Sequence, residues 1–210
     1  MTTTVFDALA AQRLVPVVVL DDAVRGPDLG RALAAGGLRC AEVTFRTAAA
    51  AEAIRLMSAE TDLLIGAGTV LDRGQVDAAV AAGARFIVSP GFSPVVVAHC
   101  QEIGVPVLPG IATATELMAA LEHGLDTVKF FPAQSLGGVG TLKALVAPFR
   151  TVRFVPTGGI TAALLPDYLA VPSVLAVGGS WMVEPALLAA ADWATVTART
   201  AAAVAVARPA

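Results

Sequence analysis

The sequence contains few cysteines and histidines, and this shortage argues against a metal centre built from soft ligands. Among 210 residues there are two cysteines, Cys40 and Cys100, and two histidines, His99 and His123. They form no Cys-x-x-Cys, His-x-x-x-His or His-Glu-x-x-His spacing, so we expect no metal site. The adjacent His99 and Cys100 are instead expected to belong to an ordinary helix, with Cys100 on its packed face.

Charge is also scarce, since Asp, Glu, Lys and Arg make up 15% of the chain. The formal net charge is −3, and the 14 basic residues are scattered along the sequence. A nucleic-acid-binding protein usually gathers Lys and Arg on one face. We therefore expect a small-molecule partner and no nucleic acid.

Long uninterrupted hydrophobic runs are absent as well. The longest stretches without Asp, Glu, Lys or Arg are Phe86–Gln101 and Tyr168–Val183, and both contain proline. A membrane-spanning helix needs about 20 mostly apolar residues. The apolar run Leu14–Leu20, between Arg13 and Asp21, is too short for the core of a signal peptide. We expect no membrane association and a cytoplasmic location.

The chain does contain abundant apolar residues, 56% of the total, with a mean hydropathy of +0.74. Such a chain folds compactly, and its length suits one domain over residues 1–210. Eight β-branched runs predict strands at residues 14–20, 40–45, 63–68, 86–89, 105–109, 127–131, 153–157 and 174–178. Helices are predicted at residues 23–35, 48–60, 72–82, 93–103, 113–123, 139–147, 161–170 and 186–206. Eight strands, each followed by one helix, favour an α/β fold of the closed (β/α)8 TIM barrel type over an open doubly wound sheet.

Lys129 is the most informative single residue, because the chain has only one other lysine, Lys143. Alternation along the run Thr127–Phe131 places Lys129 on the face opposite Val128 and Phe130, and so inside the barrel. A buried ammonium must either pair with an anion or lose its proton, and a free amine is what imine formation with a carbonyl requires. The sequence therefore predicts a Schiff-base lysine, with a structural ion pair as the alternative.

Glu42 is a second charged residue inside an apolar strand. Alternation places Glu42, Thr44 and Arg46 on one face, so a carboxylate and a guanidinium are both expected in the pocket. A confined carboxyl group can act as a proton shuttle, and an arginine can hold a substrate carboxylate through two parallel hydrogen bonds. The alternative is a structural ion pair between Glu42 and Arg46.

Glycine-rich segments follow the last two predicted strands, as Thr157-Gly158-Gly159 and Gly178-Gly179-Ser180. Barrel enzymes often bind phosphate at this place through backbone amides, although the glycines could also serve only as tight turns. The other glycine-rich segments, residues 66–71 and 138–143, lack the third glycine of a dinucleotide fingerprint, and no phosphate-binding P-loop motif occurs. We therefore expect no cofactor.

Seven strings at the predicted strand ends together resemble the 2-keto-3-deoxy-6-phosphogluconate aldolase / 4-hydroxy-2-oxoglutarate aldolase family. They are Glu42-Val43-Thr44-Phe45-Arg46-Thr47, Gly66-Ala67-Gly68-Thr69-Val70, Ser89-Pro90-Gly91, Pro109-Gly110-Ile111, Lys129-Phe130-Phe131-Pro132-Ala133, Pro156-Thr157-Gly158-Gly159-Ile160 and Gly178-Gly179-Ser180-Trp181. The resemblance implies a class I aldolase on a (β/α)8 barrel. It also implies a homotrimer that needs no metal and reversibly cleaves 2-keto-3-deoxy-6-phosphogluconate to pyruvate and glyceraldehyde 3-phosphate.

The resemblance also assigns roles to individual residues. Lys129 corresponds to the imine-forming lysine, and Glu42 to the general acid/base. Arg46 and Thr69 correspond to groups that hold the pyruvate carboxylate and keto region, and Phe131 to the aromatic wall beside the lysine. The phosphate cradle corresponds to Gly158, Gly159, Gly178, Gly179 and Ser180.

Two positions depart from the family pattern. Phe45 stands where leucine is frequent and is expected to affect packing only. Gln134 stands where glutamate is frequent and bears on the aldehyde specificity.

Several other functions also fit these motifs. The substrate could be 4-hydroxy-2-oxoglutarate or the galactonate-derived stereoisomer. A phosphosugar epimerase or isomerase would have no use for an imine-forming Lys129. The presence of every chemical residue in one sequence argues against a barrel that only binds a keto acid.

Overall fold

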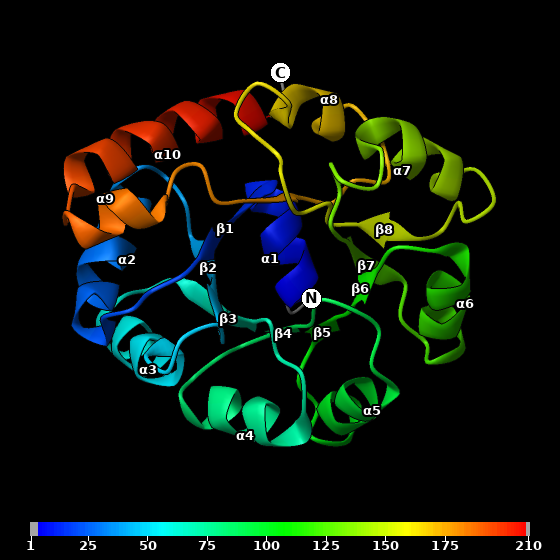
Figure 1. The fold of residues 1–210 in the computed structure, drawn as a ribbon, viewed down its shortest axis with the longest axis horizontal. Coiled ribbons are helices and arrows are strands. Elements are labelled where there is room, and N and C mark those ends of the chain that lie inside the picture. The colour runs from blue at the N-terminus through cyan, green and yellow to red at the C-terminus, as the bar shows by residue number, and fades with distance from the viewer. Residues whose placement is uncertain (1–3, 209–210) are drawn as a thin grey trace.

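Short parallel strands curve into a closed barrel in the computed structural model, which describes residues 4–208 (Figure 1). The strands are β1 (Leu14–Val18), β2 (Cys40–Thr44), β3 (Leu64–Gly68), β4 (Ile87–Val88), β5 (Val107–Leu108), β6 (Gly110–Ile111), β7 (Thr127–Phe130), β8 (Arg153–Phe154) and β9 (Val177–Gly179). Strands β5 and β6 flank Pro109, which has no N–H to donate to a neighbouring strand. They therefore count as two halves of one barrel strand, and the predicted eight strand positions are confirmed.

Every strand pairing is parallel, in the orders β5-β4-β3-β2-β1-β9 and β6-β7-β8. The remaining gap, between β8 and β9, is closed just beyond β8 by a parallel bridge from Thr157 to Gly178. There the Gly178 N–H donates to the Pro156 carbonyl at 2.9 Å. The predicted (β/α)8 barrel is confirmed.

Helices surround the barrel on its outer side (Figure 1). They are the 3-10 helix η1 (Ala23–Arg25), α2 (Gly26–Ala35), α3 (Ala50–Glu60), α4 (Arg73–Ala81), α5 (Pro94–Glu102), α6 (Ala114–Glu122), α7 (Gly138–Val146), α8 (Leu165–Leu169), α9 (Pro185–Ala189) and α10 (Trp193–Ala207). A further helix, α1 (Val5–Gln12), precedes β1 and lies inside the ring of strands. None of the helices between Thr4 and Arg208 combines the length and apolar character that a membrane crossing needs.

Two helical features differ from the sequence prediction. Helix α1 was not predicted, and it begins with a capping box in which Thr4 and Asp7 satisfy each other's backbone N–H groups. The single helix predicted at 186–206 is wrong, because the structure divides it into α9 and α10. Ala191 takes a left-handed backbone conformation at the break, and the Asp192 side chain then caps α10 by accepting from the Thr195 N–H.

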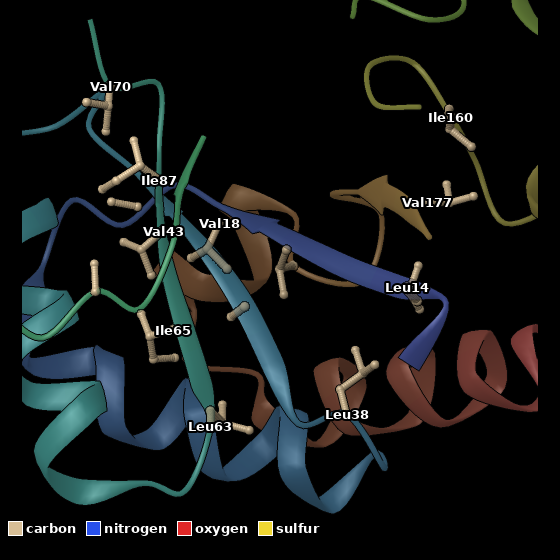
Figure 2. Packing of buried hydrophobic residues seen from close by; sticks show 14 of the residues in the cluster. Leu14, Val18, Leu38, Val43, Leu63, Ile65, Val70, Ile87, Ile160 and Val177 are labelled. Carbon is tan, nitrogen blue, oxygen red and sulfur yellow. The ribbon is translucent and has the colours of Figure 1, made fainter. Parts of the chain in front are cut away.

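The outer hydrophobic core lies between the strands and their covering helices. It includes Val18, Val43 and Ile65 from neighbouring strands, which Figure 2 shows close together. Helical residues such as Leu33 and Met57 belong to the same cluster. These side chains account for the outward-facing half of each strand, so the alternate residues point into the barrel.

A smaller inner core fills the amino-terminal end of the barrel. Leu9 of α1 is fully buried there, together with residues in or next to several strands, such as Val15, Phe86 and Val155. Figure 1 accordingly shows α1 in the centre of the ring of strands. The amino-terminal end is therefore filled with apolar side chains, and polar inward residues occur toward the carboxyl-terminal end.

Candidate active site

Lys129 and Glu42 meet inside the barrel from β7 and β2. Val128 and Phe130, on either side of Lys129, belong to the outer core, which leaves Lys129 on the inward face as predicted. The Lys129 Nζ lies 3.0 Å from Oε1 of Glu42 and 3.4 Å from its Oε2. The two side chains are only 6% and 4% exposed. The Lys129 Nζ also lies 5.3 Å from the centroid of the Phe131 ring, which gives the cation a favourable aromatic contact.

The Glu42 carboxylate occupies space that β3 leaves open. Strands β2 and β3 pair in register, with Thr44 opposite Gly68. A Cβ at Gly68 would overlap Oε1 of Glu42. Glycine at position 68 therefore makes room for the carboxylate, which explains a residue that otherwise weakens a strand.

A cavity of about 270 Å³ opens at the carboxyl-terminal end of the barrel. It brings together all the predicted substrate-binding residues except Thr69. These are Arg46, Phe131, Gly158, Gly159, Gly178, Gly179 and Ser180. Lys129 and Glu42 do not line this cavity, and Lys129 reaches it through its contact with the Phe131 ring.

Arg46 lies in the turn that follows β2, beyond the part of the chain where strand alternation applies. Its side chain is exposed and lines the cavity. Within residues 4–208 it has no ion-pair partner, so the alternative of an ion pair between Glu42 and Arg46 is not observed. Its guanidinium is consequently available for a ligand carboxylate.

Gly158 and Gly159 form the left-handed turn of the cradle, with φ of 103° and 73°. In the described part of the chain, neither of their N–H groups donates to a protein acceptor. Two unused donors at the wall of a cavity suit an anionic ligand.

Gly178 and Gly179 have a packing role that does not depend on a ligand. The Gly178 N–H is already used in closing the barrel, and a Cβ at this position would overlap Thr157. A Cβ at Gly179 would overlap the Trp181 ring. The amide of Gly178 is therefore already paired, so the predicted place of Gly178 in the cradle stays a prediction that does not rest on its N–H group.

Thr69 stands apart from the cavity at the end of β3. Its φ of 57° is unusual for a β-branched residue. No hydrogen bond in the described part of the chain explains this conformation, and strain of this kind often occurs at functional sites.

Thr157 was not predicted as a site residue, although it lines the cavity and is only 5% exposed. Alternation gives the signal that could have found it, because Val155 belongs to the inner core and the residue two positions later points the same way. The other unpredicted lining residues are Val17, Val19, Ile160, Val183 and Pro185.

No three or more His, Cys, Asp or Glu side chains between residues 4 and 208 gather as they would to hold a metal ion. Lys143, the other lysine, lies exposed on α7. Cys100 is buried on α5, as predicted, while its neighbour His99 lies 2.6 Å from Asp77.

Residues 5–199 match the family model described as KDPG and KHG aldolase. A 2-dehydro-3-deoxy-phosphogluconate aldolase from Treponema pallidum (strain Nichols) is 56% identical, over 93% of each chain. The structure of the Zymomonas mobilis ZM4 2-keto-3-deoxy-6-phosphogluconate aldolase with 3-phosphoglycerate superposes with a TM-score of 0.90. That chain is 41% identical to this one, and the match covers 97% of each chain. A Legionella pneumophila KDPG aldolase, captured with pyruvate as a covalent carbinolamine, gives a TM-score of 0.91 at 40% identity, over 94% of this chain and 96% of that one.

Proposed function

Because the chain belongs to the KDPG and KHG aldolase family and is a class I, Schiff-base aldolase, we propose that Lys129 forms the imine and Glu42 moves the protons. The observation that carries this assignment is the buried contact of 3.0 Å between Lys129 Nζ and Glu42 Oε1. One proton transfer along this hydrogen bond converts ammonium and carboxylate into free amine and carboxylic acid. The pair thereby supplies both the nucleophile and a general acid.

The reaction follows from these two groups. The Lys129 amine attacks the C2 carbonyl of the substrate, and loss of water gives a protonated imine. Glu42, once ionised, removes the C4 hydroxyl proton, the C3–C4 bond breaks, and its electron pair moves into the imine to give an enamine and a free aldehyde. Protonation of C3 and hydrolysis then release pyruvate and regenerate the amine.

The cavity determines how the rest of the substrate is held. Arg46, a cation on the cavity wall, is placed to hold the pyruvate carboxylate, and the N–H groups of Gly158 and Gly159 are the donors for a distal phosphate. Ser180 lies exposed on the same cavity wall. These features support 2-keto-3-deoxy-6-phosphogluconate as substrate, with pyruvate and glyceraldehyde 3-phosphate as products.

A second substrate, 4-hydroxy-2-oxoglutarate, is favoured by the family description, which names both activities. It has no phosphate and would leave the Gly158 and Gly159 donors unused. Comparison of kcat/KM for the two substrates tests the order of preference, and kcat/KM should be higher for the phosphorylated one.

Borohydride trapping tests the imine. Incubation with pyruvate and borohydride should attach one reduced pyruvate to Lys129 and abolish activity. The variant Lys143→Ala, which lacks only the exposed lysine, should be labelled like the wild type. Labelling of Lys143, or of neither lysine, would contradict the assignment.

The quaternary state and location belong to the same proposal. We expect a homotrimer, supported by the apolar composition and by exposed side chains such as Val24, Val95 and Met118. Sedimentation showing a monomer at micromolar concentration would contradict it. Fractionation of cells tests the expected cytoplasmic location.

A further inference from the structure

We propose that the hydrogen bond between Gln134 and Tyr168 positions the Gly158-Gly159 turn and thereby favours a phosphorylated substrate. The proposal rests on the function proposed for this site. It concerns two residues outside the cavity lining and assigns them no contact with the reacting atoms.

Gln134 is joined to the turn through its backbone. Beyond β7 and β8 the two chain segments continue side by side, and the Ala133 N–H donates to the Thr157 carbonyl at 2.8 Å. The Gln134 N–H then donates to the Gly158 carbonyl at 3.0 Å. A displacement of Gln134 would therefore be transmitted directly to Gly158.

The side chain of Gln134 also packs directly against the Gly158-Gly159 turn. A Cβ built on Gly159 would lie 2.8 Å from Cβ of Gln134 and 3.2 Å from its Cγ. The turn therefore rests on the aliphatic part of Gln134, and only glycine allows so close an approach at a φ of 73°.

Tyr168 fixes the far end of this side chain. The Gln134 Nε2 donates to the Tyr168 Oη at 2.8 Å. The Tyr168 side chain is fully buried on α8. Residues 160–164 connect the Gly158-Gly159 turn to this helix. The hydrogen bond thus joins the loop after β7, which carries Gln134, to helix α8, which carries Tyr168. Both segments are thereby fixed next to the Gly158-Gly159 turn.

The chemistry of the pair suits a permanent anchor. Burial raises the pKa of the Tyr168 phenol, so the hydroxyl stays protonated throughout the neutral range and adds no charge. Gln134 is neutral as well. The hydrogen bond between the two side chains is therefore retained throughout the neutral pH range.

Loss of this anchor should loosen the turn without disturbing Lys129 or Glu42. The ground-state and transition-state contacts of the phosphate would weaken together, and uniform weakening raises KM while kcat stays the same. Substrates that lack a phosphate should be unaffected. A rise in KM for the phosphorylated substrate alone therefore distinguishes a positioning role from a general loss of structure, which would affect both substrates.

The test uses Gln134→Ala, Tyr168→Phe and the double variant, with Gln101→Ala as a matched control. Gln101 also donates one amide hydrogen bond, to the His123 carbonyl at 2.7 Å, but it lies on α5. In each of the three variants we expect KM for 2-keto-3-deoxy-6-phosphogluconate to rise about 2- to 12-fold, the range that a net hydrogen bond corresponds to. The inhibition constant of inorganic phosphate should rise by the same factor, and the double variant should be no worse than either single one.

Gln134→Glu provides the rescue, because the Tyr168 hydroxyl can donate to a carboxylate at the same place. It should remain within about twofold of wild type if its hydrogen bond is equivalent. The KM for 4-hydroxy-2-oxoglutarate and the yield of borohydride-trapped pyruvate should stay constant in all variants.

Equal losses on both substrates, or a Gln134→Glu variant as impaired as Gln134→Ala, would overturn the proposal. If the wild type favours the phosphorylated substrate and the variants keep that preference, only the positioning role fails. If wild-type kcat/KM were the same for the phosphorylated and the unphosphorylated substrate, both the phosphate site and the positioning role of Gln134 and Tyr168 would be wrong. Absence of pyruvate trapping on Lys129 would instead contradict the catalytic assignment.

Discussion

Gly68 faces Glu42 so closely that the backbone of one strand shapes the position of a carboxylate on the next. Replacement by alanine would push the carboxylate away from Lys129. We expect Gly68→Ala to lower kcat by about 10²-fold or more, since general acid/base catalysis contributes about 10²- to 10⁴-fold. Gly140→Ala is the matched control, because a Cβ there would meet nothing within 4 Å. Steady-state kinetics of both variants check this, and a fully active Gly68→Ala enzyme would contradict it.

Glu42→Gln tests proton transfer with the least change of shape. The variant should still form the imine with pyruvate, but slowly, and should lose about 10²- to 10⁴-fold in turnover. Aldol cleavage and the exchange of pyruvate methyl protons, followed by NMR, measure the two proton transfers. Glu52→Gln breaks the exposed ion pair with Arg55 and should have no effect on either rate. If Glu42→Gln exchanged protons at the normal rate, another group would have to be the base.

Ser180→Asp tests the phosphate site without disturbing the packing of a glycine. Ser180 is exposed on the cavity wall, whereas any side chain at Gly179 would overlap Trp181. A carboxylate at position 180 should lower kcat/KM for 2-keto-3-deoxy-6-phosphogluconate by about 10²-fold, the size of one or two lost charge-assisted hydrogen bonds. Cleavage of 4-hydroxy-2-oxoglutarate should fall less. Ser180→Asn separates bulk from charge, and equal losses on both substrates would argue against a phosphate at this wall.

Both cysteines should be unreactive in the native protein. Burial raises the pKa of Cys40 to about 12 and that of Cys100 to about 11. At pH 8 only about 10⁻⁴ and 10⁻³ of each thiol would be the reactive thiolate. A thiol reagent should therefore modify neither residue until urea unfolds the chain. Rapid modification of the folded protein would contradict this.

The same two thiols should make the free energy of unfolding decrease at alkaline pH. Their pKa values are higher in the folded than in the unfolded chain, where about 8.5 is usual. Their contribution to the free energy of unfolding is therefore complete below about pH 8.5 and decreases as the pH rises above it. Urea unfolding at pH 7.5 and pH 10 should show the decrease, and Cys40→Ala should reduce it.

Strand periodicity was sufficient to locate Lys129 and Glu42 on the inward face, because both lie within regular strands. It did not apply to Arg46, which follows the end of β2. Arg46 therefore does not share a strand face with Glu42, and it is exposed and has no ion pair within residues 4–208. The ends of the helices predicted at residues 72–82 and 93–103 were predictable for a local reason, because a glycine follows each of them. Gly83 and Gly104 both adopt the left-handed conformation that ends a helix.

Other features depend on segments that are distant in the sequence and could not be predicted from it. The eight residues of α1 form a short helix that is stabilised by the burial of Leu9 among strands from the whole barrel. The contact of Gln134 with Tyr168 joins residues 34 positions apart. Neither contact has a signature in local periodicity.

Helix α1 also has a kinetic consequence, because the buried Leu9 closes the amino-terminal end of the barrel, and the cavity between residues 17 and 185 opens at the other end. Under the proposed mechanism the pyruvate half stays bonded to Lys129 after the C3–C4 bond breaks, while the aldehyde half is already free. The products therefore leave in a fixed order, with the aldehyde first and pyruvate after hydrolysis. In the direction of synthesis the order reverses, and aldehyde that enters before pyruvate obstructs the reaction instead of starting it.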